Sequence, residues 1–194
     1  PKGRTELSEE EKQHLGLPVF VKPARGGSSI GVSKVNSWEE FPAAVDLALE
    51  DDEKILVEPE IVGQEVEIGV LHYADGTLLA SVPALLAGID DSDEGFYGFD
   101  TKYLDNVVTA EIPAPFTPEL TEKLRDMAVR AFEALNCEGL SRVDFFVTED
   151  SVYINEINTL PGFTPISMYP QVLAASGVEY PALLEALIEQ ALAK

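Results

Sequence analysis

Two neighbouring segments in which polar and apolar residues alternate constrain the fold of this chain more than any other feature. Residues 140–147 and 152–157 both alternate in this way, and alternate side chains of a β-strand point to opposite faces of a sheet. Only a short polar stretch separates the two segments, so we expect two paired strands with one apolar and one polar face. The positions expected on the apolar face are Val143, Phe145 and Ile157.

Strand-like and helix-like segments alternate along the rest of the chain, which favours an α+β fold built in layers, with α/β layering as the wider class. Ser8 with Glu11, and Thr117 followed by Pro118, have the spacing of helix N-termini. Residues 86–100 are rich in glycine and acidic residues and read as a long loop. Further strands are expected at residues 17–22, 32–35, 54–58, 65–71 and 78–82, and further helices after Ser37 and near 166–175 and 182–193. The apolar stripe expected on the helix after Thr117 is Leu120, Leu124, Met127, Ala128, Ala131 and Leu135.

The polar face of the first strand pair is a candidate metal site. Arg142 and Asp144 share one face of their strand, and Glu156 and Asn158 share one face of theirs. If the strands pair, two carboxylates and an amide oxygen converge beside a guanidinium, and oxygen ligands completed by phosphates and water are what Mg²⁺ prefers. The alternative is a solvated sheet face with a cross-strand Arg–Glu pair.

A second candidate site is the Gly/Ser-rich segment between the first two expected strands. Backbone N–H groups around Gly27, with the hydroxyls of Ser28 and Ser29, can surround phosphate oxygens, and Lys22 would add a positive charge. The pattern of a Walker loop is absent. The alternative interpretation is a plain β-hairpin turn.

The formal net charge of −22, from 13 basic and 35 acidic residues, argues against nucleic-acid and anionic-membrane partners. Charges more than about 8 Å apart are largely screened from each other at physiological salt. A triphosphate can therefore bind to this acidic chain where basic residues gather. We expect that local positive charge from Lys22, Arg25, Lys34, Lys102 and Arg142. Cys137 is the single cysteine, which favours a reducing cytoplasm over a disulfide-bonded protein.

Five motifs, in order along the chain, resemble the D-alanine–D-alanine ligase family of ATP-grasp enzymes. They are VFVKP, RGGSSIGVSKV, FYGFDTKYLD, GLSRVDFF and INEINTLPGFTPISMYP. The match runs from about residue 15 to residue 194. The resemblance implies an ATP-grasp fold, in which two α+β subdomains with mostly antiparallel sheets enclose the nucleotide. It also implies that the N-terminal domain of the family is missing, so that residues 1–16 are a remnant, 17–83 the small subdomain, and 84–194 the C-terminal subdomain with a lid loop at 86–105.

The chemistry implied by the resemblance is ATP-dependent joining of two D-alanines through an acyl phosphate, for peptidoglycan precursors. Two Mg²⁺ ions, or Mn²⁺, would be held by Asp144, Glu156 and Asn158. Arg142 and the Gly162 N–H would stabilise the tetrahedral intermediate, and Ser167 and Met168 would receive the second D-alanine. Tyr103 would hydrogen-bond toward Ser28 and favour an amine acceptor. The ATP-binding residues implied are Lys22, Gly27, Ser28, Ser29, Glu58, Ile61, Glu65 and Lys102.

Two alternatives stay open beside this interpretation. One is an ATP-grasp ligase that joins a different carboxylate and amine. The other is a stand-alone nucleotide-binding or regulatory module that kept the fold without turnover, which the missing N-terminal domain favours. We expect the chain alone not to ligate. The resemblance further implies a cytoplasmic enzyme that forms a homodimer at full length.

Overall fold

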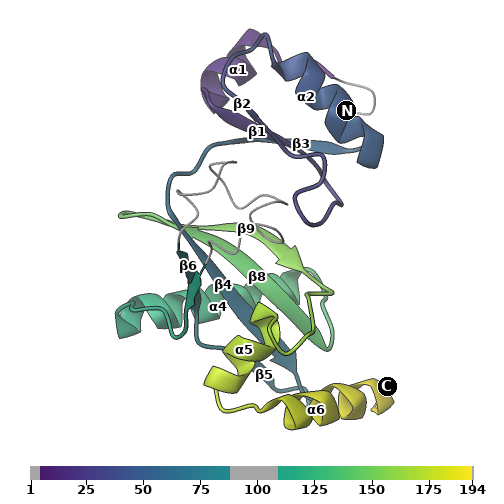
Figure 1. The fold of residues 1–194 in the computed structure, drawn as a ribbon, viewed down its shortest axis with the longest axis vertical. Coiled ribbons are helices and arrows are strands. Elements are labelled where there is room, and N and C mark those ends of the chain that lie inside the picture. Colours follow the sequence, from purple (N-terminus) through teal and green to yellow (C-terminus); the bar gives the residue numbers. More distant parts are fainter. Residues whose placement is uncertain (1–4, 88–108, 194) are drawn as a thin grey trace. The chain divides into compact units, whose positions relative to one another are not determined.

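Backbone hydrogen bonds divide the strands into two separate antiparallel sheets (Figure 1). The computed structural model describes residues 5–87 and 109–193. The described residues form two compact units, the first from residues 5–61 and the second from Val62–Ala87 with residues 109–193. The expected α+β class is confirmed, and the expected lid loop lies outside the described residues from residue 88 onward.

The first unit is a three-stranded sheet covered by a helix. The sheet order is β2 (Ser33–Val35), β1 (Val19–Pro23) and β3 (Ile55–Pro59), and α2 (Phe41–Asp51) packs against it. Alternate residues of β1 are fully buried against the apolar side of the helix, which is the packing expected of a sheet with one covered face. The buried core residues are Val19, Val21, Val35, Phe41, Ala44, Val45 and Ala48.

Local sequence signals set the helix ends in this unit. The capping box predicted at Ser8 and Glu11 is present and starts α1 (Glu9–Leu15), which ends at Gly16. The helix expected after Ser37 begins later, at Phe41, because a turn over residues 38–40 precedes it and proline occupies its first turn.

The second unit is built on a six-stranded sheet in the order β7, β6, β4, β8, β9, with β5 paired to β4. The hairpin predicted between residues 65 and 82 is confirmed by the β4–β5 pairing, as is the pairing of β8 with β9. The strands are β4 (Gln64–His72), β5 (Leu78–Ala80), β6 (Ala84–Ala87), β7 (Thr109–Glu111), β8 (Leu140–Val147) and β9 (Val152–Asn158).

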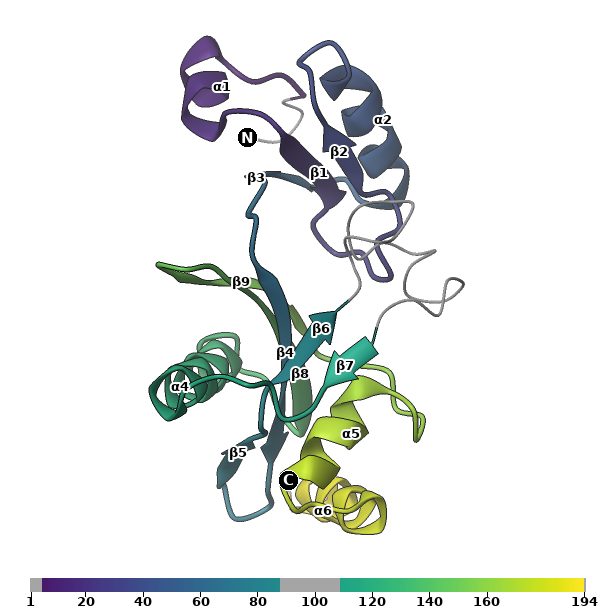
Figure 2. The same ribbon diagram turned by 60° about the vertical axis from the view of Figure 1, so that its left-hand side comes forward.

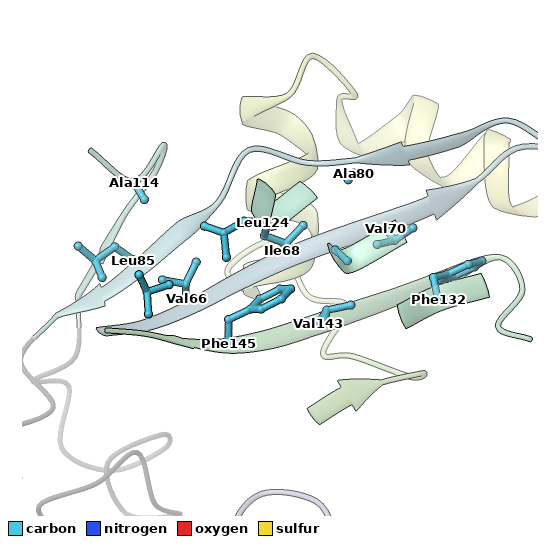
Figure 3. Packing of buried hydrophobic residues seen from close by; sticks show 12 residues of the cluster. Val66, Ile68, Val70, Ala80, Leu85, Ala114, Leu124, Phe132, Val143 and Phe145 are labelled. Atoms are coloured by element: carbon cyan, nitrogen blue, oxygen red, sulfur yellow. The ribbon is translucent and has the colours of Figure 1, made fainter. Parts of the chain in front are cut away.

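Helices cover both faces of this sheet (Figure 2). On one face, α4 (Pro118–Ala134) packs against Val66, Ile68 and Val70 of β4 and Val143 and Phe145 of β8, as Figure 3 shows. On the other face, α5 (Met168–Ala175) and α6 (Tyr180–Leu192) share a second core with Leu71. No helix in the described part of the chain is long and apolar enough to cross a membrane.

Two expectations differ from this arrangement. We expected the boundary between the two subdomains at residues 83 and 84, but the structure divides the chain after Ile61. The reason is that β4 pairs with β6 and β8 and therefore belongs to the second unit. The stripe predicted on α4 included Leu135, but that residue caps the helix and is 60% exposed, whereas Phe132 is buried in its place.

Gly69 of β4 permits the close approach of α5 to the sheet. A Cβ atom at this position would lie 2.5 Å from Leu173 Cδ2 and 3.1 Å from ring atoms of Tyr169. Both of those side chains are fully buried, so neither has room to move away.

We expect Gly69→Ala to destabilise the second unit by about 1–3 kcal/mol, the usual cost of overpacking a core. Urea unfolding followed by far-ultraviolet circular dichroism would measure the loss. The single tryptophan, Trp38, packs on Phe41 in the first unit, so its fluorescence transition should stay unchanged as an internal control. Adding Leu173→Ala should cost less than the sum of the two single changes; strict additivity would contradict the proposed clash.

Candidate functional site

The register of β8 and β9 brings the predicted metal-site residues together. Arg142 lies opposite Asn158, and Asp144 lies opposite Glu156. Residues directly opposite in an antiparallel pair share one sheet face. The buried positions of β8 alternate with these polar ones and belong to the α4 core, so the predicted polar face is confirmed.

A β-bulge in β9 decides which side chains reach this face. Asp144 pairs with Glu156 but its neighbour Phe145 pairs with Ile154, so Asn155 is the additional residue. Bulges re-aim side chains and are frequent beside active sites. Without this one, the alternation would place Ile154 on the same face as Glu156.

Glu67 of β4 extends the polar row to a third strand. It lies opposite Asp144, so Glu67, Asp144 and Glu156 form a line across β4, β8 and β9. Glu67 is only 4% exposed. Glu67 is not among the residues predicted from the sequence, although a carboxylate between Val66 and Ile68, both core residues, was the available signal.

Arg142 is the cationic centre of this cluster. Its Nε and Nη2 donate to the two carboxylate oxygens of Asp144, both at 2.7 Å, and its Nε is 3.1 Å from Glu67 Oε2. Burial acts to lower the pKa of Arg142. The hydrogen bonds to Asp144 and the charges of Asp144, Glu67 and Glu156 outweigh burial and raise that pKa above its usual value.

The oxygen atoms of this cluster are of the type that a hard divalent cation prefers. Three carboxylates face one guanidinium, and carboxylate and amide oxygens are suitable ligands for Mg²⁺. Each Asp144 oxygen that accepts from Arg142 keeps a second acceptor position. Among the described residues, however, no three His, Cys, Asp or Glu side chains are arranged to hold a metal ion, and Asp144 is engaged by Arg142.

The Gly/Ser-rich segment joins β1 to β2 as a shaped loop. β1 and β2 do pair as a hairpin, but residues 24–32 form the connection in place of a tight turn. Ser28 and Ser29 have left-handed backbones, with φ of 54° and 57°, which L-residues adopt at a cost. Backbone N–H groups in turn conformations can form concave anion-binding sites.

An ion pair fastens this loop to the end of α2. Arg25 Nη2 and Nε lie 2.6 Å and 3.0 Å from the carboxylate oxygens of Asp52, and the same carboxylate accepts from the Lys54 N–H at 3.1 Å. The Asp52 side chain is buried. The hydrogen bonds from Arg25 and Lys54 hold the pKa of Asp52 well below its ordinary value.

The other basic residues near the motifs are also paired with carboxylates. Lys22 Nζ lies 2.6 Å from Glu58, and Lys34 Nζ lies 2.6 Å from Glu60. With Arg25 and Arg142 also in ion pairs, the expectation of local excess positive charge is wrong for the described residues, while Lys102 lies outside them. Acidic partners come close because the chain carries 35 acidic residues against 13 basic ones.

The expected acceptor residues meet at the start of α5. Ser167 is the N-cap residue of this helix, and its Oγ lies 3.1 Å from the Thr164 N–H and 2.8 Å from Thr164 Oγ1. A Cβ on Gly162 would come within 3.0 Å of Ser167 Oγ, so these two residues are neighbours. The Met168 side chain instead packs on the core between α5, α6 and the sheet.

The remaining expected residues are distributed over both units. Glu65 lies on β4 opposite Phe146, two residues before Glu67, and therefore on the same face as the polar row. Ile61 ends the first unit. Tyr103, like Lys102, lies outside the described residues.

The chain matches the family model described as D-ala D-ala ligase C-terminus over residues 1–189. A protein of Corynebacterium efficiens named D-alanine–D-alanine ligase is 66% identical over 189 residues, which cover 97% of this chain and 52% of that protein. The chain therefore spans about half the length of such curated relatives.

Solved structures of related ligases have the same fold. D-alanine–D-alanine ligase from Bacillus anthracis, complexed with ATP, superimposes with a TM-score of 0.78 at 26% identity, covering 99% of this chain and 58% of that one. The VanG D-Ala:D-Ser ligase from Enterococcus faecalis also gives a TM-score of 0.78, at 34% identity over 94% of this chain and 52% of that one.

The Arg25–Asp52 pair makes the stability of the first unit depend on pH. The folded state lowers the pKa of Asp52, so its stabilisation is present above the unfolded pKa of about 3.9 and is lost as pH falls toward the folded value. We expect Asp52→Asn to lower the urea midpoint of the Trp38 fluorescence transition at neutral pH. The difference from wild type should shrink below about pH 4.

The matched control for this experiment is Asp46→Asn. Asp46 is exposed on the same helix, and its replacement should change the midpoint little. A difference between the wild type and the Asp52→Asn variant that stays constant from neutral to acidic pH would contradict the ionic clamp.

Proposed function

Because the chain belongs to the D-ala D-ala ligase C-terminus family, we propose that it is the ATP-binding half of a D-alanine–D-alanine ligase that supplies peptidoglycan precursors. The observation that carries this proposal is the convergence of Arg142, Asp144, Glu156 and Asn158 on one sheet face. Hard oxygen donors beside a guanidinium suit phosphoryl transfer, which depends on positioning and charge stabilisation more than on covalent chemistry by the protein.

Asp144, Glu156 and Asn158 are the residues proposed to hold two Mg²⁺ ions, or Mn²⁺. When bound, such ions would neutralise charge on the phosphates of ATP. Arg142 and the Gly162 N–H would stabilise the oxyanion of the tetrahedral intermediate, because fixed donors at a developing charge cost no reorganisation.

The nucleotide would be bound largely by backbone groups. Gly27, Ser28 and Ser29 lie in the loop whose N–H groups and hydroxyls suit phosphate oxygens. Lys22 Nζ lies 2.6 Å from Glu58, and because an ammonium has three donors this lysine could also donate to a phosphate. The further proposed ATP contacts are Ile61, Glu65 and Lys102.

The proposed reaction has two steps. The carboxylate of one D-alanine attacks the γ-phosphorus of ATP, which releases ADP and leaves an acyl phosphate. The amine of a second D-alanine, received near Ser167 and Met168, then attacks the acyl carbon, and phosphate leaves as the amide forms. Tyr103, hydrogen-bonded toward Ser28, is proposed to favour the amine acceptor. We further propose a cytoplasmic location and a homodimer at full length.

Two other functions remain candidates. The similarity to a D-Ala:D-Ser ligase favours D-serine as a second candidate acceptor. A module that binds nucleotide without turnover is the other.

A chimera tests the proposed activity. Residues 1–189 of this chain would replace the matching segment of the C. efficiens relative, and phosphate release from ATP would be measured. We expect release that depends on D-alanine, with D-Ala-D-Ala as product. Arg142→Ala in the chimera should reduce the rate by about 10²–10³, the usual cost of a lost oxyanion donor.

Three results separate the candidates. A D-Ala-D-Ser product that predominates in mixed substrates would assign the D-serine acceptor. ATP binding without amino-acid-dependent release would indicate the binding module. Release that is equal with L-alanine and D-alanine would contradict the ligase proposal.

Glu156→Gln tests the proposed metal ligands. Removal of this carboxylate should abolish the increase in ATP affinity that Mg²⁺ gives, because an amide is a weaker Mg²⁺ ligand than a carboxylate. Calorimetric titrations of ATP with Mg²⁺ and with EDTA would measure it. Glu149→Gln, at an exposed position in the β8–β9 turn, is the matched control. Unchanged Mg²⁺ dependence in Glu156→Gln would refute the assignment.

A further inference from the structure

Glu67 is a buried carboxylate to which the proposed mechanism gives no role. Its side chain is 5% exposed, compared with 15% for Arg142 and 14% for Asp144. Its position is fixed by the fold, because the flanking Val66 and Ile68 are buried in the α4 core. A carboxylate at such depth needs a compensating charge, and the Arg142 guanidinium supplies one.

Arg142 is shared unequally between two carboxylates. Its Nε lies 2.7 Å from Asp144 Oδ1 and 3.1 Å from Glu67 Oε2, and its Nη2 lies 2.7 Å from Asp144 Oδ2. A short rotation of the guanidinium therefore exchanges its main partner. The two carboxylates lie directly opposite each other on β8 and β4, so the exchange needs no movement of the backbone.

This arrangement matters for any cation that binds Asp144. The cation would compete with Arg142 for the carboxylate oxygens of Asp144. A partly buried guanidinium left without a carboxylate strongly destabilises the folded protein. A second carboxylate within reach removes that penalty. The charge of Arg142 then stays compensated while Asp144 turns to the metal.

We propose that Glu67 is a positioning residue that takes over Arg142 when a divalent cation occupies Asp144. The inference rests on the proposed function, since it needs a metal ion and nucleotide at this face. Glu67 would thereby raise the affinity for the metal and hold Arg142 in place for the oxyanion. It touches neither substrate nor metal itself.

The test is Glu67→Gln, which keeps the size of the side chain and removes its charge. ATP titrations by calorimetry, with Mg²⁺ and with EDTA, are compared for the wild-type chain and the variant. We expect affinity in Mg²⁺ to fall by about 10–100-fold, the usual effect of losing a residue that orients a metal ligand, and affinity in EDTA to stay unchanged. Glu67→Asp keeps the charge but shortens the side chain, so its ATP affinity in Mg²⁺ should lie between those of the wild type and Glu67→Gln.

Glu122→Gln is the matched control. Glu122 pairs with Arg125 at 2.7 Å on the surface of α4 in the same unit, so its loss removes a Glu–Arg pair away from the polar row. If Glu67→Gln lowers the ATP affinity in both Mg²⁺ and EDTA, its role is merely structural and the inference is overturned. If the affinity does not fall in either condition, Glu67 has no role in binding and the inference is also overturned. If the wild-type chain itself shows no Mg²⁺-dependent ATP binding, the proposed function fails and the inference fails with it.

A measurement on the wild-type chain covers the case in which Glu67→Gln does not fold. The Nε–H resonance of Arg142, assigned with Arg142→Lys, reports the partner of this nitrogen. We expect it to shift when Mg²⁺ is added with ATP, and to shift much less with ATP in EDTA. An identical resonance in both conditions would overturn the exchange of partners.

Discussion

The β4–β8 ladder is the constraint on which the rest of the second unit depends. Its register runs from Gln64 opposite Val147 to Leu71 opposite Leu140. Since successive residues face opposite sides of a sheet, this one register commits Val66, Ile68 and Val143 to the α4 core. It also commits Glu67, Arg142 and Asp144 to the other face. A slip by one residue would place charges in the core, so the stability of the fold and the geometry of the site are set together.

The sheet face opposite α4 has two parts along the length of β4, one covered by helices and one polar. Beyond Gly69, α5 and α6 cover the sheet and pack on Leu71. Before Gly69, the same face carries the polar row that begins at Glu67. The helices end their coverage where the acidic residues begin, and the strands that carry these residues are anchored by two cores.

Ion pairs reduce the free positive charge that this acidic protein could offer to a phosphate ligand. Lys22, Arg25, Lys34 and Arg142 each lie beside a carboxylate. A triphosphate would therefore meet neutralised pairs in place of free cations in these described positions. The proposed binding of a triphosphate would then use backbone N–H groups of the 24–32 loop, a metal ion, or carboxylates that change partner. Glu67 is suited to such an exchange because it already shares the Arg142 guanidinium.

Periodicity and turn chemistry within short segments were enough to predict the α+β class and the main strands and helices. They also predicted that Arg142, Asp144, Glu156 and Asn158 share one face once their two strands pair. The motifs also indicated the family. That Glu67 joins this group is seen in the folded chain alone, because its partner strand lies more than seventy residues away along the chain. The same holds for the ion pair between Arg25 and Asp52 and for the division of the chain after Ile61. Pairings between distant segments depend on how sheets assemble, and no local pattern encodes them.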